Sequence, residues 1–241
     1  MIYSSLMIPL FIKQVTYRTL GMRNFCLVKG LWNVARGFEK SYEDFLGLLP
    51  NGGLLLDIGA NIGITTAFAL RKRPDLSVIA FEPIPTNLAA AKRLCRTLRV
   101  KEVDFRQVAL GDSVGTIEMV LPNIDDMPAP GQTFALNDES DPLFSHLKER
   151  GTRFTVPLKK IDSFDLPKVH GIKLDVENFE GQVLRGATEL LKRDHPVIYC
   201  ELWDTPNRGM VMSLLSELGY VCERLDTKED FLFRYSPASG L

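Results

Sequence analysis

Cysteine is scarce in this sequence, and its spacing excludes two common kinds of stabilising site. Four cysteines occur among 241 residues, at positions 26, 95, 200 and 222, and no two of them form a C-x-x-C pair. Structural zinc sites need closely spaced ligand pairs, and disulfide frameworks belong to shorter, cysteine-rich chains. Cys95 and Cys200 lie inside apolar runs, so we expect buried thiols and a reducing, cytoplasmic environment.

Histidine and surplus basic charge are also scarce. The sequence has three histidines, a formal net charge of −1 at pH 7 and a pI of about 6.3. Binding to a phosphate backbone needs an excess of Lys and Arg, so we do not expect nucleic acid as a partner. His170 and His195 directly precede expected strands, which places them at the far end of a sheet from its ligand site. His146 falls in a loop region, where we expect a solvated side chain.

A long hydrophobic run and a signal peptide are both missing. The apolar N-terminus, MIYSSLMIPLFIK, has no basic leading segment or cleavage site, and it is too short to span a bilayer. We expect it to pack within the protein or in a homodimer, with peripheral membrane attachment as the alternative. Residues 1–49 are expected to form a helical cap, with a helix over 31–49, and residues 50–241 a single domain.

Residues 54–65, reading LLLDIGANIGIT, have the order strand, glycine turn and helix. Gly59, Asn61 and Gly63 form the turn, and glycine lets a ligand approach the backbone closely. A second strand ends at Glu82, 19 positions after Gly63. In mononucleotide folds, an acidic residue about 20 positions past the glycines binds ribose hydroxyls. The pattern therefore indicates a nucleoside-cofactor site.

Strands and helices alternate along most of the chain. The expected strands are 54–57, 77–82, 104–110, 171–176, 197–202, 220–225 and 231–235, and the expected helices are 64–72, 87–98, 181–193 and 208–218. This alternation predicts an α/β fold with a doubly wound, mostly parallel sheet. The turn before the last strand is too short for a crossover, so that strand must run antiparallel. Residues 115–121 are expected to pair across the 111–115 turn, 122–150 to form a long excursion, and 154–158 an added strand.

Several carboxylates follow strands of the expected sheet, where open α/β folds bind their ligands. Asp175, Glu177 and Glu180 lie within KLDVENFE, and Glu201 ends another strand next to Trp203. Carboxylates brought close together repel, which raises the pKa of one of them toward the range of a general base. They could instead collect a hard cation, or Glu177 and Glu180 could stabilise the next helix through its dipole.

Taken together, these segments resemble the FkbM family of S-adenosylmethionine-dependent methyltransferases over roughly residues 38–220. The matching pieces are LLLDIGANIG (54–63), AFEP (80–83), VALGD (108–112), IKLDVENFEG (172–181), VLRGA (183–187) and IYCEL (198–202). The family usually reads D-V-E-G-x-E, whereas this chain has Asn178 at the glycine position. Asparagine tolerates left-handed backbone angles better than most residues, so we expect the turn to survive.

The resemblance implies a Rossmann-like class I methyltransferase with a seven-stranded sheet, and S-adenosyl-L-methionine as cofactor. It assigns Asp57, Gly59, Ala60, Asn61 and Gly63 to the methionine part, Glu82 and Pro83 to the ribose, and Val108 and Ala109 to the adenine. The expected partner is a small-molecule hydroxyl, on a sugar, polyketide or related metabolite. Removal of the hydroxyl proton needs a base or a metal. We expect a carboxylate, Asp175 or Glu177 ahead of Glu201, and no metal.

Two other functions fit the fold. A nicotinamide-dependent oxidoreductase would use a similar glycine turn, but Asn61 replaces the second glycine of G-x-G-x-x-G and would crowd a pyrophosphate. A non-catalytic binding module would not need Asp57, Glu82 and Asp175 together.

Overall fold

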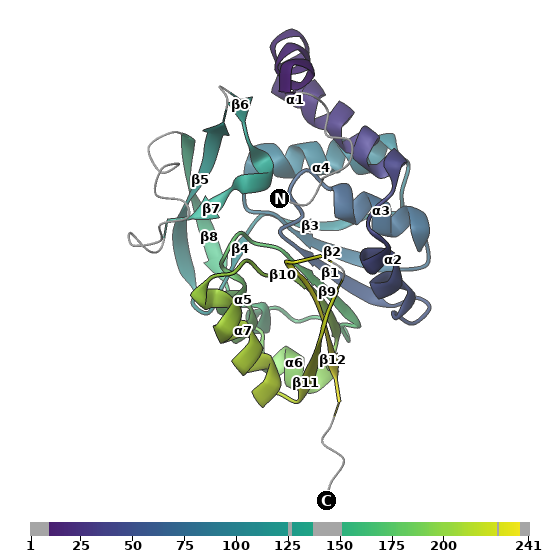
Figure 1. Ribbon diagram of the computed structural model, residues 1–241, viewed down its shortest axis with the longest axis vertical. Helices are drawn as coiled ribbons and strands as arrows, with labels where there is room; N and C mark the ends of the chain where they lie inside the picture. Colours follow the sequence, from purple (N-terminus) through teal and green to yellow (C-terminus); the bar gives the residue numbers. More distant parts are fainter. Residues whose placement is uncertain (1–9, 125–126, 137–150, 226, 237–241) are drawn as a thin grey trace, which may run out of the picture.

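The computed structural model describes residues 10–124, 127–136, 151–225 and 227–236. A central twisted sheet lies between two layers of helices, and a second, smaller sheet extends from one side of it (Figure 1).

The central sheet has seven strands within the described residues, in the spatial order β11-β12-β10-β9-β1-β2-β3. Their bounds are β1 Leu54–Ile58, β2 Ser77–Phe81, β3 Asp104–Arg106, β9 Gly171–Leu174, β10 Val197–Glu201, β11 Tyr220–Arg224 and β12 Asp230–Tyr235. Strands β3, β2, β1, β9 and β10 are parallel, and β12 pairs antiparallel with both of its neighbours. The expected sheet and its antiparallel last strand are confirmed.

Helices cover both faces of this sheet because its strands are apolar on both sides. On one face lie α1 (Leu10–Arg36), α2 (Lys40–Gly47), α3 (Ile64–Lys72) and α4 (Pro85–Thr97), and on the other α5 (Glu180–Arg185), α6 (Thr188–Asp194) and α7 (Pro206–Glu217). Successive side chains of a strand point to opposite faces. Leu55 accordingly packs with Phe45 of α2 and Phe68 of α3, whereas Leu56 packs in the other core, with residues such as Val183 of α5.

The smaller sheet corrects two of our expectations. Its path is β4 (Ala109–Leu110), β8 (Gly151–Lys159), β5 (Gly115–Ile124) and β6 (Met127–Pro128), with β7 (Phe134–Ala135) also paired to β5. The expected strand 104–110 is therefore two strands in different sheets. Residues 115–121 do not pair across the 111–115 turn, because β8 inserts between β4 and β5 and pairs with β5 over eight residue pairs.

Two expected helices are each divided in the structure. The helix expected over 31–49 is the end of α1 followed by α2, with a break at Gly37, whose φ is 88°. The helix expected over 181–193 is α5 followed by α6. Gly186 lies between them, packed so closely that a Cβ placed there would lie 1.9 Å from the Gly111 carbonyl oxygen. Close backbone contact with the β4 end therefore sets this division.

The N-terminal helix is bent at Gly21, and its second half packs on the domain. Phe25 and Cys26 contact Ile62 and Ala90, and Val34 packs with Leu94. The packing expected for the apolar segment of residues 1–13 falls outside the described side chains, and the division at residue 49 and a homodimer contact stay predictions. None of the described helices is both long enough and apolar enough to span a bilayer. Cys26, Cys95 and Cys200 are buried, and all four cysteines are free.

Two glycine-to-alanine substitutions test the close contact at Gly186. We expect Gly186→Ala to lower the free energy of unfolding by about 1–3 kcal/mol, because the new methyl group overpacks against backbone. Gly209→Ala is the matched control. Gly209 lies inside α7 with open space around its Cβ position, so alanine should stabilise the helix by up to about 1 kcal/mol. Urea unfolding measures both, and equal effects would contradict the assignment.

Candidate active site

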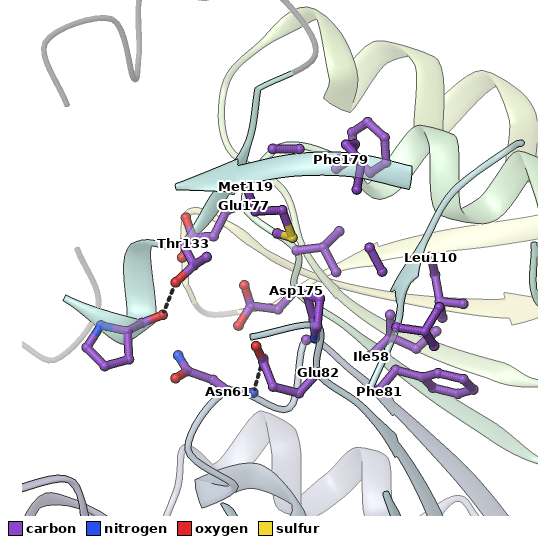
Figure 2. Close-up of a pocket in the computed structure, with 18 of the residues that line it drawn as sticks. Ile58, Asn61, Phe81, Glu82, Leu110, Met119, Thr133, Asp175, Glu177 and Phe179 are labelled. Atoms are coloured by element: carbon purple, nitrogen blue, oxygen red, sulfur yellow. Dashed lines mark hydrogen bonds between the residues drawn. The ribbon is translucent and has the colours of Figure 1, made fainter. Parts of the chain in front are cut away.

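A cavity lies beyond the carboxyl ends of β1, β2 and β9, where the smaller sheet closes over the central one. Its volume is about 660 Å³, counting the solvent at its mouth. Figure 2 shows polar side chains on one side of this space and apolar side chains on the other. Its size and mixed lining suit a small-molecule ligand.

The turn after β1 forms the floor of the cavity. Gly59 has φ 79°, and a Cβ there would lie 1.8 Å from the carbonyl oxygen of Asp175. The N–H groups of Gly59 and Ala60 both donate to the Phe81 carbonyl oxygen, at 3.1 and 3.0 Å. Gly63, with φ 83°, begins α3 and packs on Ala91. Gly59 and Asn61 line the cavity, whereas Ala60 and Gly63 support the turn from outside its lining.

Glu82 follows β2 and lines the cavity next to this turn. It is 4% exposed, and its carboxylate accepts hydrogen bonds from the backbone N–H of Asn61 at 2.8 Å and of Ile84 at 2.9 Å. Burial raises the pKa of Glu82 to about 7, although these N–H donors act in the opposite direction. The glycine turn therefore positions Glu82, as the spacing in the sequence suggested.

Asp57 is fully buried beneath the cavity and does not line it. Its carboxylate accepts hydrogen bonds from Thr65 and Thr66 in the first turn of α3, and Lys173 Nζ lies 3.7 Å from its Oδ1. Asp57 thus lies beneath the lining of the cavity, and its expected role at the methionine part stays a prediction. The residue holds the start of α3 against the sheet.

Apolar residues from both sheets form the opposite wall. Val108, Ala109 and Leu110 lie where the chain passes from β3 to the smaller sheet, and Met119 of β5 and Phe179 complete this side. Pro83 also lines the cavity. Such a surface suits a flat, weakly polar group such as a nucleobase.

Lys173 connects the acidic loop to the glycine turn. Its ammonium lies on β9, directly across from Asp57 in the strand register, and it is 3.2 Å from Asp175 Oδ2 and 3.2 Å from the Gly59 carbonyl oxygen. Burial opposes its charge, but Asp175 and Asp57 outweigh burial and raise the pKa of Lys173. Asp175 lines the cavity with its side chain 34% exposed.

Two residues of the acidic loop have left-handed backbones, with φ 56° at Glu177 and 71° at Asn178. The expected survival of the turn at Asn178 is confirmed, and Thr205 Oγ1 donates to its Oδ1 at 2.5 Å. Glu177 lines the cavity, and burial, followed by the charges of Asp175 and Glu201, raises its pKa well above the usual value. Its Oε2 and the Oδ1 of Asn61 are buried at the cavity without a hydrogen-bond partner among the described residues.

Glu180 and Glu201 have mainly structural surroundings. Glu180 Oε1 accepts from the Val176 N–H at 3.1 Å, and its Oε2 accepts from Asn207. Glu201 does not line the cavity, and its Oε1 accepts from Trp203 Nε1 at 3.1 Å. The negative charge of Asp175, followed by burial, raises the pKa of Glu201 to about 8. We expected Glu201 in the site itself, but it lies behind the residues that line the cavity.

The structure adds residues that the sequence patterns did not single out. Pro130, Gly131 and Thr133 of the long excursion roof the cavity, around the short helix η1 (Pro130–Gln132). Lys173 could have been noticed as a lysine inside a buried strand. The length of the excursion indicated that it helps to build the acceptor pocket, but not which of its residues do so.

The histidines lie away from the cavity or outside the described residues. His170 Nδ1 accepts from the Leu54 N–H at the amino end of β1, and His195 stacks on Tyr235. His146 falls outside the described residues. Within those residues, no group of three or more His, Cys, Asp or Glu side chains is arranged to hold a metal ion.

Comparison with known proteins gives one family for this chain. A family model described as "Methyltransferase FkbM domain" matches residues 57–222. "Methyltransferase 1" of Beauveria bassiana is 28% identical over 162 residues, covering 63% of this chain and 64% of the fungal protein. "31-O-demethyl-FK506 methyltransferase FkbM" of Streptomyces tacrolimicus is 26% identical over 194 residues, covering 71% and 74%. The chain thus spans less than two thirds of the Beauveria protein.

Among solved structures, methyltransferase FkbM from Methylobacillus flagellatus has a TM-score of 0.54 and 17% identity to this chain. The match covers 78% of this chain and 45% of that one. At this identity, the likeness shows a shared fold.

The raised pKa of Glu201 predicts how stability changes with pH. In the folded protein its pKa is about 8, against roughly 4.3 in an unfolded chain. The stabilisation that Glu201 contributes to the folded state is therefore fully present below about pH 4 and is lost as the pH rises through 8. We expect Glu201→Gln, which keeps an acceptor for Trp203, to lose less stability than the wild type between pH 6 and 9. Urea unfolding across this range measures the slope, which is the change in the free energy of unfolding with pH.

Glu189→Gln is the matched control, since Glu189 forms an exposed pair with Lys192 on α6. Its slope should equal that of the wild type. The remaining slope of the Glu201 variant comes from other carboxyl groups whose pKa values burial raises, among them Glu39, Glu82 and Glu180, each to about 7, and Glu177. Parallel curves for all three proteins would refute the assignment.

Proposed function

Since this chain belongs to the FkbM methyltransferase family, we propose that it transfers a methyl group from S-adenosylmethionine to a hydroxyl oxygen of a small molecule. The observation that carries the proposal is the cavity at the strand ends, where Glu82, Asp175 and Glu177 are combined with an apolar wall and two unpartnered polar oxygens.

The charges of the cavity fit this cofactor. Among the described residues, the ionisable side chains that line it are all acidic, namely Glu82, Asp175 and Glu177. S-adenosylmethionine has two positively charged groups, a sulfonium and an ammonium, which such a lining favours. The partnerless Asn61 Oδ1 is a hydrogen-bond acceptor buried at the turn. Since buried polar atoms normally have partners, a bound ammonium or hydroxyl would complete it.

The nucleoside part fits the remaining lining. Glu82 is at the carboxyl end of β2, the place at which an acidic residue binds ribose hydroxyls in mononucleotide folds. Val108 and Ala109 offer the adjoining apolar surface for adenine, together with Leu110. Gly59 and Asn61 would contact the methionine part, while Asp57, Ala60 and Gly63 would position the turn from behind.

Asp175 is the residue that we assign as general base. When bound, the cofactor supplies an electrophilic methyl group. Asp175 would accept the proton of the acceptor hydroxyl, and the cofactor, having supplied its methyl group, would leave as S-adenosylhomocysteine. Burial, followed by the charges of Asp175 and Glu201, raises the pKa of Glu177 well above its usual value, and Glu82 already accepts backbone N–H groups. Asp175 is exposed to the cavity and stays fixed through Lys173. Glu177 would orient the acceptor, and positioning itself contributes to the rate.

The names of the relatives indicate the class of acceptor molecule only broadly. The Streptomyces relative is named for 31-O-demethyl-FK506. For this chain we propose a hydroxyl on a sugar, a polyketide or a related metabolite, bound under the roof formed by Pro130, Gly131 and Thr133.

Calorimetry with S-adenosylhomocysteine and with NAD tests the cofactor. We expect the homocysteine compound to bind and NAD not to bind. Glu82→Gln should weaken binding by about tenfold or more, since it removes a charge-assisted acceptor. Glu223→Gln, an exposed carboxylate on β11, is the control and should bind as the wild type does. Binding of NAD instead, or of neither compound, would overturn the proposal.

Substitution of Asp175 tests the chemical step. We expect Asp175→Asn to reduce methyl transfer by about 10²–10⁴-fold while leaving the affinity for S-adenosylhomocysteine within about threefold of the wild type. The assay is transfer of labelled methyl groups to a panel of sugar and polyketide alcohols. Asp204→Asn, whose carboxylate is exposed just beyond β10, is the matched control. Full turnover by the Asp175 variant would exclude it as the base.

A further inference from the structure

Positive charge is concentrated in three helices of a chain whose net charge is −1. Helix α1 has Arg18, Arg23, Lys29 and Arg36; α3 has Arg71 and Lys72, of which Lys72 pairs with Glu43 of α2 at 3.0 Å; and α4 has Lys92, Arg93 and Arg96. None of the three helices contains an aspartate or glutamate. The net charge of the chain is therefore close to zero although one part of the molecule is strongly basic.

These three helices form one layer, on the same face of the central sheet (Figure 1). Helix α1 packs on both α3 and α4. Phe25 contacts Ala90, and Val34 packs with Ala67 and Leu94. Arg93 Nη1 donates to the Arg23 carbonyl oxygen at 3.1 Å and to Asn24 Oδ1 at 2.9 Å. We call α1, α3 and α4 the basic layer.

The outer side of the basic layer also exposes large apolar residues. On α1, Val15, Leu20, Val28 and Trp32 are each 42–47% exposed. Val28 and Trp32 are four residues apart and so share one face of the helix. The guanidinium of Arg36, one turn further on, lies 5.9 Å from the Trp32 ring centre. Aliphatic, indole and basic side chains thus occur together on one exposed helix.

Elsewhere in the described residues, exposed large apolar side chains are dispersed. Leu48, Val114, Met210, Val221 and Tyr235 belong to five different parts of the chain. Isolated apolar residues of this kind are normal on protein surfaces. By contrast, the concentration of exposed apolar side chains on α1, combined with the positive charge around them, is unusual.

We propose that the basic layer docks on an anionic membrane surface, with α1 lying in the interface and Trp32 and Val28 among the lipid headgroups. Interfacial helices combine basic residues with tryptophan and aliphatic side chains in this way. The bound surface is a bilayer rather than nucleic acid, because exposed valine and leucine gain nothing from phosphate contacts. A second copy of the chain is disfavoured, since two basic layers would repel each other.

The docking surface adjoins the cavity without being part of it. Helix α1 contacts β6, and the chain continues from β6 to η1, whose Pro130 and Gly131 roof the cavity. The proposal does not depend on the methyl-transfer assignment, because no residue of the site takes part in it.

Vesicle flotation of the full chain tests the proposal. We expect binding to vesicles of 70% phosphatidylcholine and 30% phosphatidylglycerol, and little binding to pure phosphatidylcholine. Arg18→Gln with Arg23→Gln should weaken binding by about tenfold or more, since each basic residue near the surface contributes about 1 kcal/mol. Val28→Ser with Trp32→Ser should weaken binding by roughly tenfold through lost apolar contact.

Two double variants serve as controls. Lys160→Gln with Lys168→Gln removes two exposed charges outside the basic layer, and Leu48→Ser with Val221→Ser removes two exposed apolar residues outside it. Both should bind anionic vesicles as the wild type does, and circular dichroism checks that every variant is folded. No vesicle binding, binding that is unaffected by the α1 substitutions, or binding of a 30-nucleotide RNA in place of vesicles would overturn the proposal.

Discussion

The buried ammonium of Lys173 is the interaction on which the site depends. Removing a charge from water is costly, so a lysine that is 5% exposed must be compensated by nearby acceptors. The compensation comes from three segments that are far apart in sequence: Asp57 at the end of β1, the Gly59 carbonyl in the turn, and Asp175 after β9. One side chain thereby holds the glycine turn and the acidic loop at a fixed separation. The absence of a Cβ at Gly59 lets the two backbones meet at that separation.

The same arrangement explains why the neighbouring carboxyl groups differ from one another. Asp175 and Asp57 pair with the ammonium, and their negative charges then act on the groups behind them. Asp175 is the largest cause of the raised pKa of Glu201 and a contributor, after burial, at Glu177. The acidic residues at the sheet edge are thus divided by their surroundings: Asp175 pairs with an ammonium, whereas burial and nearby negative charge raise the pKa of Glu177 and of Glu201. This division is the usual basis of acid–base assignment in active sites.

Local sequence patterns predicted the parts of the molecule that local physics determines. The helix expected over 64–72 is α3, and the turn between Gly59 and Gly63 and the position of Glu82 follow from glycine conformation and strand length. The errors occurred where distant backbone decides. Gly186 divides a helix because Gly111 is packed against it, and β8 separates β4 from β5 although it lies about 40 residues away in sequence. The excursion of residues 122–150 was expected over the sheet edge from its length alone, but it lacked any periodic pattern, so the structure was needed to show that Pro130 and Thr133 form the roof.

The net charge of the sequence is also a poor guide to how charge is distributed over the surface. A net charge near zero argues against polyanionic partners only if the charges are mixed over the surface. Here acidic residues collect around the cavity, where they suit a cationic cofactor, and the basic residues of α1, α3 and α4 lie together on one face of the sheet. Each group has the field of a much more highly charged protein over a distance of about one Debye length, roughly 8 Å at physiological salt. Two ligands of opposite charge can therefore be attracted by one nearly neutral chain.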